Sequence, residues 1–240
     1  MPEKPTVAAA YAPGHVALVR ATCLYVATKL GEELCPQLVR GLRRAGFSQD
    51  ENEDGNPTRQ RWKIVQKAKV TVDFLIQPTR ADDRGGKLRD IEADFAAVIA
   101  PGLHLAFEDR RSVTISGRTI MGENATRDVW VCGPGSYVTL KALAFDLRGE
   151  NKDAYDLFYL LRNYGSGVAD VAAGLRALLP DSDAERALTV LRRDFLEHDA
   201  VGPRRVAQFL TGSADDSIQA DVVGFMAELL RLIEGAQPRD

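Results

Sequence analysis

The sequence predicts an α+β fold, in which a small mixed β-sheet with helices is followed by a C-terminal helical bundle. The first observation behind this prediction is that helical and strand-like apolar patterns alternate up to about residue 134. The second is that almost every apolar residue beyond this point recurs at helical spacing. The 240 residues therefore divide into an α/β part over residues 1–133 and a helical part over residues 134–240.

The first element is a predicted helix over residues 31–45. Leu34, Leu38 and Leu42 recur every fourth residue and form one apolar face. The polar, acidic stretch over residues 49–58 has no apolar period and is predicted to be a loop.

A predicted β-hairpin follows, with strands over residues 61–65 and 70–76. Alternation in the second strand places Asp73 between apolar neighbours. Aspartate is depleted in strands, so this carboxylate is a candidate functional group. We expect the strand to lie in a small mixed sheet against which the helix over residues 31–45 packs.

Residues 88–99 follow a loop and are predicted to form a helix, because their apolar members fall at helical spacing. Asp90, Glu92 and Asp94 are then expected to lie on its solvated side. The remaining predictions are strands over residues 112–116 and 127–131, and helices near 135–148, 152–164, 168–179, 182–198, 201–210 and 215–235.

Composition excludes several classes of protein. The formal net charge is −3, which argues against a generic nucleic-acid-binding protein. The three cysteines are scattered, so the chain has neither a disulfide framework nor a thiolate zinc cluster, and this favours a reducing, cytoplasmic location. No segment is apolar enough to span a membrane and no secretory signal is recognised, so a membrane partner is not expected.

Two weaker patterns are explained without a site. Residues 50–55 match the opening of an EF-hand calcium loop, but the twelfth position is Arg61 where a bidentate Glu is needed, which favours a solvated acidic turn. The histidines are His15, His104 and His198, and no nucleophile motif accompanies them, so a hydrolase triad has no support.

The most informative segment is residues 131–164, where a strand leads into a helix carrying Lys141 among apolar residues. A tight turn after Arg148 delivers Lys152 and Asp153 to the next helix, on which Asp153 and Asp156 share a face. Each feature has a structural alternative: a lone Lys reaches solvent along its aliphatic chain, and a helix dipole favours acidic residues in the first turn.

In combination, this segment resembles the C-terminal motif of the AbiEii and MenT nucleotidyltransferase toxins, which belong to the polymerase-β-like nucleotidyltransferase superfamily. The matching residues, in order, are Pro134, Lys141, Ala144, Arg148, Lys152, Asp153, Asp156 and Leu157. Upstream, residues 38–47 resemble the family's helix and the Gly-Phe turn that ends it. Arg61-Trp62 and then residues 72–75, which resemble the family's Val-Asp strand, follow in the same order.

The resemblance implies transfer of a nucleoside monophosphate from an NTP to an RNA or protein acceptor, by an in-line displacement assisted by Mg²⁺. It implies that Asp73 is a metal ligand and that Lys141, Arg148 and Lys152 bind the nucleotide. Asp153 and Asp156 become polar groups of the same catalytic site. It also implies a cognate antitoxin as a partner.

This sequence departs from the N-terminal motif of the family. Arg20-Ala21-Thr22 is followed by Leu24 and Val26 where the family has the two aspartates of its Asp-x-Asp motif, and its Gly-Ser turn is missing. One carboxylate is a poor site for two Mg²⁺ ions. We therefore expect weak Mg²⁺ binding and slow or absent transfer.

Three functions stay open: an active nucleotidyltransferase, a non-catalytic module of that fold that binds nucleotide or a partner protein, and an unrelated helical binding protein. If the resemblance is right, Asp73, Lys141 and Asp153 or Asp156 face one cleft.

Overall fold

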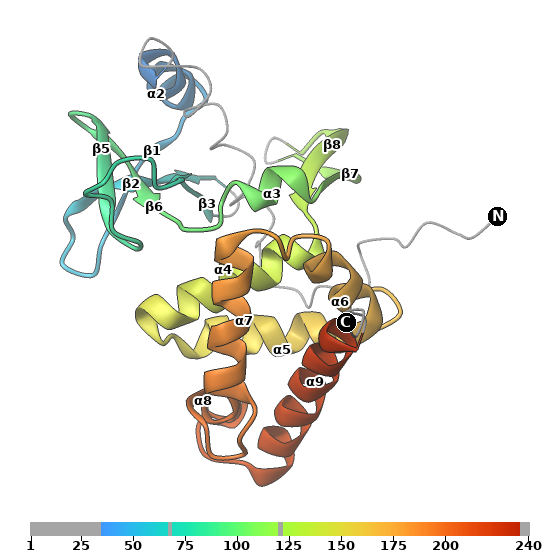
Figure 1. Cartoon of the computed structure of the whole chain (residues 1–240). Coiled ribbons are helices and arrows are strands. Elements are labelled where there is room, and N and C mark those ends of the chain that lie inside the picture. Colours follow the sequence, from blue (N-terminus) through green and yellow to red (C-terminus); the bar gives the residue numbers. More distant parts are fainter. Residues whose placement is uncertain (1–34, 67–68, 120–121, 236–240) are drawn as a thin grey trace. The chain divides into compact units, whose positions relative to one another are not determined.

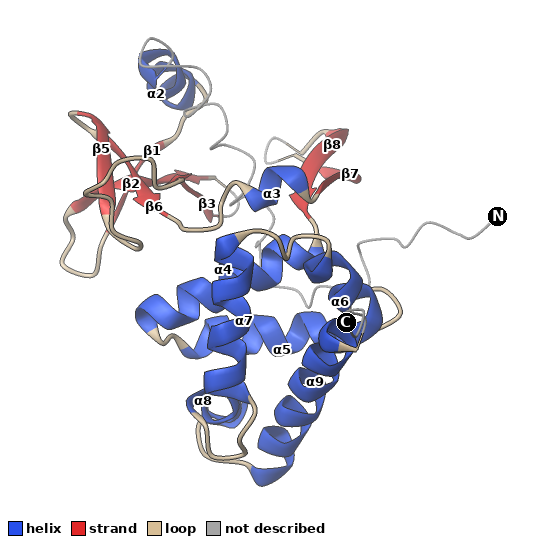
Figure 2. Cartoon of the chain, in the orientation of Figure 1, coloured by secondary structure: helices blue, strands red, loops and turns tan. Residues whose placement is uncertain are grey.

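The computed structural model describes residues 35–66, 69–119 and 122–235. It confirms the predicted α+β class, with small β-sheets and a run of C-terminal helices (Figures 1 and 2). The described residues form two compact units. One contains the residues up to Ala100 together with Arg111–Val131, and the other contains Pro101–Arg110 and the chain from Cys132 onward. Segment Pro101–Arg110 thus groups with the helices, although it precedes residue 133.

The α/β unit contains an antiparallel sheet of order β1-β2-β3. Its strands are β1 (Ser48–Glu51), β2 (Pro57–Val65) and β3 (Lys69–Asp73). The register pairs Arg61 with Asp73 and Val65 with Lys69, which confirms the predicted hairpin. The predicted loop over residues 49–58 is wrong in part, because β1 and the first residues of β2 occupy both of its ends.

The second sheet has the order β4-β6-β5. Strand β4 (Leu75–Ile76) runs parallel to β6 (Phe95–Ile99), and β5 (Leu88–Glu92) runs antiparallel to β6, so this sheet is mixed. The buried rings of Trp62, Phe74 and Phe95 pack together, with the centroids of Phe74 and Phe95 4.7 Å apart.

The predicted single strand over residues 70–76 is divided at Phe74. The N–H of Phe74 donates to the carbonyl of Gln60 in one sheet, whereas its own carbonyl accepts from Val98 in the other. Phe74 therefore passes the chain from the first sheet to the second.

The predicted helix over residues 88–99 is wrong, because these residues form the β5–β6 hairpin. Strand β6 is buried along almost its whole length. A strand buried on both faces shows a continuous apolar run instead of alternation, and periodicity does not distinguish it from a buried helix. Asp90 and Glu92 consequently lie on a strand, where Asp90 pairs with Arg59 at 2.8 Å.

Helix α2 (Cys35–Arg44) confirms the predicted first helix within the described residues and packs against β5. Its Arg43 forms an ion pair with Asp94 and lies 5.8 Å from the ring centroid of Trp62. The predicted strands over residues 112–116 and 127–131 are confirmed as parts of β7 (Arg110–Arg118) and β8 (Asn124–Cys132), a two-stranded ribbon.

The helical unit begins with the short helix α3 (Leu105–Glu108), which the sequence did not predict. All the longer helices were predicted: α4 (Pro134–Arg148), α5 (Asn151–Asn163), α6 (Val168–Arg176), α7 (Ser182–Phe195), α8 (Val201–Thr211) and α9 (Asp216–Glu234). They enclose one continuous apolar core, centred on fully buried side chains such as Leu157, Leu191 and Met226. Among the described residues, no helix combines the length and hydropathy that crossing a bilayer requires.

Candidate functional site

The charged residues that end α4 and begin α5 form the candidate site. Helix α4 stops at Gly149, whose backbone is left-handed (φ 63°), and α5 begins two residues later. Glycine adopts this conformation without steric cost, so the chain reverses in a tight turn. The turn places Arg148 at the end of one helix beside Asp153 in the first turn of the next.

Ion pairs join these helices into one network. The Lys141 Nζ lies 2.9 Å from Asp153 Oδ1 and 2.6 Å from Asp156 Oδ2. Arg148 donates to both oxygens of Asp153, at 2.6 and 2.8 Å, in a bidentate contact. Lys152 donates to both oxygens of Asp156, at 2.8 and 2.7 Å. We call these residues (Lys141, Arg148, Lys152, Asp153 and Asp156) the α4–α5 charge network.

Burial is uneven across the network. The side chain of Asp153 is 1% exposed and that of Lys141 is 17% exposed, whereas Arg148 and Lys152 are 53% and 42% exposed. Burial by itself would raise the pKa of Asp153, but hydrogen bonds from Arg148 and Lys141 and their positive charges lower it below its ordinary value. Hydrogen bonding to Asp153 likewise raises the pKa of Arg148.

These contacts decide between two interpretations of Lys141. A lysine that merely reaches solvent would be exposed at its ammonium group, but here Lys141 is shared by Asp153 and Asp156. The structure therefore brings together all the site residues predicted between Lys141 and Asp156. Cations outnumber carboxylates in the network, and its two most exposed members are both cations.

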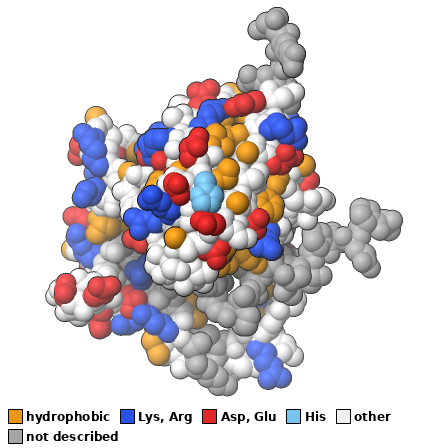
Figure 3. All heavy atoms as spheres, turned by 90° about the horizontal axis from the view of Figure 1, so that it is seen from below, with side chains coloured by type: hydrophobic (Ala, Val, Ile, Leu, Met, Phe, Trp, Pro, Cys, Tyr) orange, Lys and Arg blue, Asp and Glu red, His pale blue; other side chains and the backbone are white. Residues whose placement is uncertain are grey.

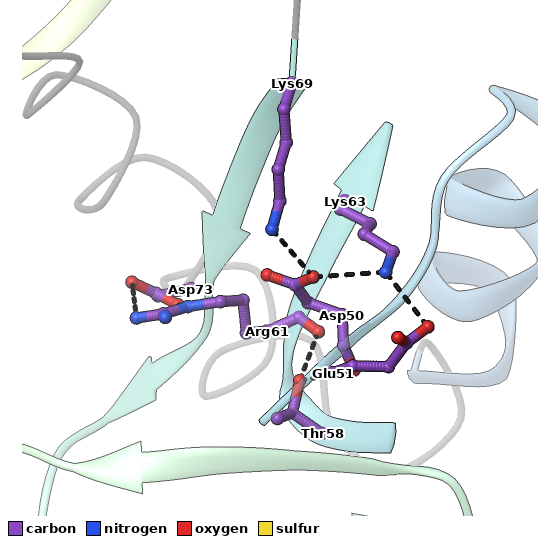
Figure 4. A network of polar contacts seen from close by, with 7 residues as sticks. All are labelled: Asp50, Glu51, Thr58, Arg61, Lys63, Lys69 and Asp73. Atoms are coloured by element: carbon purple, nitrogen blue, oxygen red, sulfur yellow. Dashed lines mark hydrogen bonds and ion pairs between the residues drawn. The ribbon is translucent and has the colours of Figure 1, made fainter. Parts of the chain in front are cut away.

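Asp73 has a different partner. Its Oδ1 lies 2.5 Å from Arg61 Nε and its Oδ2 lies 3.1 Å from Arg61 Nη2, so both oxygens accept from one guanidinium group (Figure 4). Asp73 belongs to the α/β unit, whereas the α4–α5 charge network belongs to the helical unit. The common cleft predicted for these residues stays a prediction.

Mg²⁺ requires near-octahedral oxygen ligands, which a single guanidinium-bound carboxylate does not provide. Within the described ranges, no group of three acidic, His or Cys side chains that includes Asp73 lies close enough to share an ion. The described residues around Asp73 thus do not fit a two-metal centre, and no reaction step is assigned to a metal there. The expected aspartate positions, Leu24 and Val26, lie outside the described residues.

A second polar network, which the sequence did not predict, surrounds Asp50 on β1 (Figure 4). Asp50 is buried, and its Oδ1 lies 3.3 Å from Lys63 Nζ and 3.0 Å from Lys69 Nζ. Burial would raise its pKa, but the hydrogen bond from Lys69 and further bonds from Glu51 and Lys63 lower it. The solvated turn predicted over residues 50–55 is therefore wrong at Asp50, which is a buried strand residue with two lysine partners.

The N-terminus of α4 already holds a carboxylate. The Oδ2 of Asp109 accepts from the backbone N–H of Ser136 at 3.1 Å and lies 3.4 Å from its Oγ. A helix N-terminus attracts anions because its first N–H groups lack partners. Here the chain supplies that anion itself, so a phosphate bound at the start of α4 would have to displace Asp109.

Positive and negative side chains are intermixed on the face of the molecule in Figure 3. A scan against protein-family models gave no match, and searches of the curated proteins and of the solved structures likewise gave none.

Proposed function

We propose that this protein is a nucleotidyltransferase-like protein that binds the phosphates of a nucleoside triphosphate through its α4–α5 charge network. The observation that carries the proposal is the convergence of Lys141, Arg148 and Lys152 on Asp153 and Asp156. The resemblance of residues 131–164 to the C-terminal motif of the AbiEii and MenT toxins supports the choice of nucleotide as ligand. Localisation in the cytoplasm, with its supply of NTP, belongs to the same proposal.

The division of roles within the network follows from exposure. Arg148 and Lys152 are half exposed, so their remaining N–H groups are available to a phosphate at the surface. Lys141 lies behind them and adds positive charge at short range. Asp153 and Asp156 hold all these cations in fixed positions, which reduces the entropy lost when a phosphate binds.

Of the two functions that fit a nucleotidyltransferase fold, the contacts of Asp73 favour the non-catalytic one. The Arg61 guanidinium occupies both oxygens that a metal ion would need. We therefore propose nucleotide binding as the activity, with NMP transfer to an RNA or protein acceptor slow or absent, and a protein such as an antitoxin as a partner.

Calorimetric titration with ATP and GTP tests the binding step. Lys152→Gln and Arg148→Gln are expected to weaken NTP binding several-fold, whereas Arg162→Gln is expected to leave it unchanged. Arg162 is a matched control, because it lies on the same helix and is a cation whose ring contact is with Phe158, outside the network. Equal affinities in the wild type and all variants would contradict the proposal.

Incubation with labelled NTPs, Mg²⁺ and tRNA tests the chemical step. We expect no transfer of label above the level of a protein-free control. Strong transfer that depends on Mg²⁺ would establish the catalytic alternative.

A further inference from the structure

A second cluster of polar side chains lies in the helical unit, at the start of α7 and away from the α4–α5 charge network. It contains His104, which precedes α3, and Asp181 and Asp183, which begin α7. Each side chain offers one ligand atom, and these atoms lie within 4.8 Å of one another. Residues about 80 positions apart in the sequence meet here, which a local turn does not explain.

Backbone hydrogen bonds hold both carboxylates while leaving one oxygen of each for another partner. The Oδ1 of Asp181 accepts from the N–H of Asp183 at 2.8 Å, and its Oδ2 faces His104 Nε2 at 2.8 Å. The Oδ2 of Asp183 accepts from the N–H of Gly102 at 2.8 Å. Hydrogen bonds of this kind orient the carboxylate ligands in metal sites.

The ring of His104 presents Nε2 to the carboxylates. Its Nδ1 is buried and has no hydrogen-bond partner among the described residues. All three side chains are partly exposed, which leaves a route for an ion and room for a water ligand. Nothing in the proposed nucleotide-binding function uses this cluster.

From this geometry we propose that His104, Asp181 and Asp183 bind one divalent transition-metal ion, of which Zn²⁺ is the model. Imidazole nitrogen and carboxylate oxygen are both ligands of Zn²⁺, and a water molecule would complete a four-coordinate set. Ligand atoms about 2.0–2.2 Å from the ion lie roughly 3.3–3.6 Å apart in a tetrahedral site. The Nε2 atom of His104 and the Oδ2 atom of Asp181 are 2.8 Å apart, a hydrogen-bond distance, so they would move apart by roughly half an ångström as the ion replaces the proton between them. Side-chain rotation of Asp183 would complete the set.

The ion would join the turn before α3 to the first turn of α7. Gly102, next to this turn, has φ +75° and donates its N–H to Asp183. The ion therefore acts as a structural cross-link between segments that are distant in sequence, and no catalytic role is assigned to it.

Titration of the chelator-treated, full-length protein with Zn²⁺, in competition with a chromophoric chelator, tests this proposal. The wild type is expected to bind one more equivalent than His104→Gln. His198→Gln is the matched control, since His198 also lies beside aspartates, with its Nδ1 3.2 Å from Asp199 Oδ1 and its Nε2 3.9 Å from Asp216 Oδ1. It is expected to keep the wild-type stoichiometry.

Asp183→Asn provides a second variant that is expected to fold, because the amide oxygen still accepts from Gly102. It should weaken Zn²⁺ binding at least tenfold, and the rise in melting temperature that Zn²⁺ gives the wild type should disappear. Equal Zn²⁺ binding by the wild type, His104→Gln and Asp183→Asn would overturn the proposal and leave the cluster as a set of structural hydrogen bonds only.

Discussion

Asp153 is the residue on which the α4–α5 charge network depends, because it is fully buried and contacts both Lys141 and Arg148. Replacing it by Asn removes the negative charge that Lys141 and Arg148 share. We expect Asp153→Asn to lower the free energy of unfolding by about 2 kcal/mol. The full cost of a broken buried pair is not expected, since Arg148 reaches solvent and Lys141 keeps Asp156. Denaturant unfolding followed by circular dichroism measures the change, with exposed Asp221→Asn as an unaffected control.

The same carboxylate predicts a pH dependence. The pKa of Asp153 is lower in the folded chain than the value near 3.9 of an unfolded one. Its contribution to stability is therefore present above the unfolded pKa and is lost as the pH falls through the folded pKa. The difference in unfolding free energy between the wild type and Asp153→Asn should be constant from about pH 5 to 8 and shrink below about pH 4. An undiminished difference at still lower pH would show that the charge of Asp153 is not its source.

Asp73 gives the opposite kind of test, since the contacts argue that it binds Arg61 and not Mg²⁺. Asp73→Asn is expected to leave the weak Mg²⁺ affinity unchanged in calorimetry. Asp73 is buried but its partner Arg61 reaches solvent, so loss of this ion pair should cost about 0.5–1.5 kcal/mol of unfolding free energy. A tenfold loss of Mg²⁺ affinity in this variant would instead identify Asp73 as a metal ligand.

The helices and strands whose apolar residues recur with a clear period could be predicted from the sequence. The strands that are buried on both faces could not. The longer helices after Pro134 show an apolar period in the sequence, and helices α6 to α9 each keep exposed residues among their buried ones. Strand β6 has no solvated face, so its sequence shows no alternation, and the pattern predicts a helix where the β5–β6 hairpin lies. The break at Phe74 was also hidden, because its cause is the pairing with Val98, more than twenty residues away.

Helices α4 and α6 offer a prediction at the scale of elements, because Gly135 and Gly174 meet where they pack. A Cβ atom added to Gly135 would lie 2.4 Å from the carbonyl oxygen of Gly174. Gly135→Ala is therefore expected to destabilise the helical unit by about 1–3 kcal/mol or more. Gly224→Ala in α9 is the control: its Cβ would meet nothing within 4 Å, and a gain of about 1 kcal/mol follows from helix propensity. Thermal unfolding distinguishes the two, and equal effects would contradict the packing argument.

At the scale of the whole molecule, the sequence predicted which residues of the α4–α5 charge network lie together. It did not predict contacts between segments that are distant in the chain. Lys141, Arg148 and Asp153 lie close together in the chain, and a single helix–turn–helix brings them into contact. Long-range partners left no local trace in the sequence: Asp109 for the start of α4, and His104 for Asp181. These contacts depend on how distant segments pack.

The distribution of apolar contacts over the molecule predicts unequal local stability. Helices α4, α5 and α7 contribute fully buried side chains to the core of the helical unit. In the β7–β8 ribbon, by contrast, most residues of both strands are exposed, and a two-stranded ribbon has little stability of its own. Hydrogen exchange of a backbone amide requires local opening, whose free energy rises with the buried contacts that opening breaks. Hydrogen exchange measured by mass spectrometry should therefore find amides in β7 and β8 exchanging at least a hundredfold faster than those at the centre of α4. This ratio corresponds to a difference of about 2.7 kcal/mol between the free energies of local opening. Comparable protection of the ribbon and of α4 would show that the ribbon is stabilised by contacts that its exposure does not reveal.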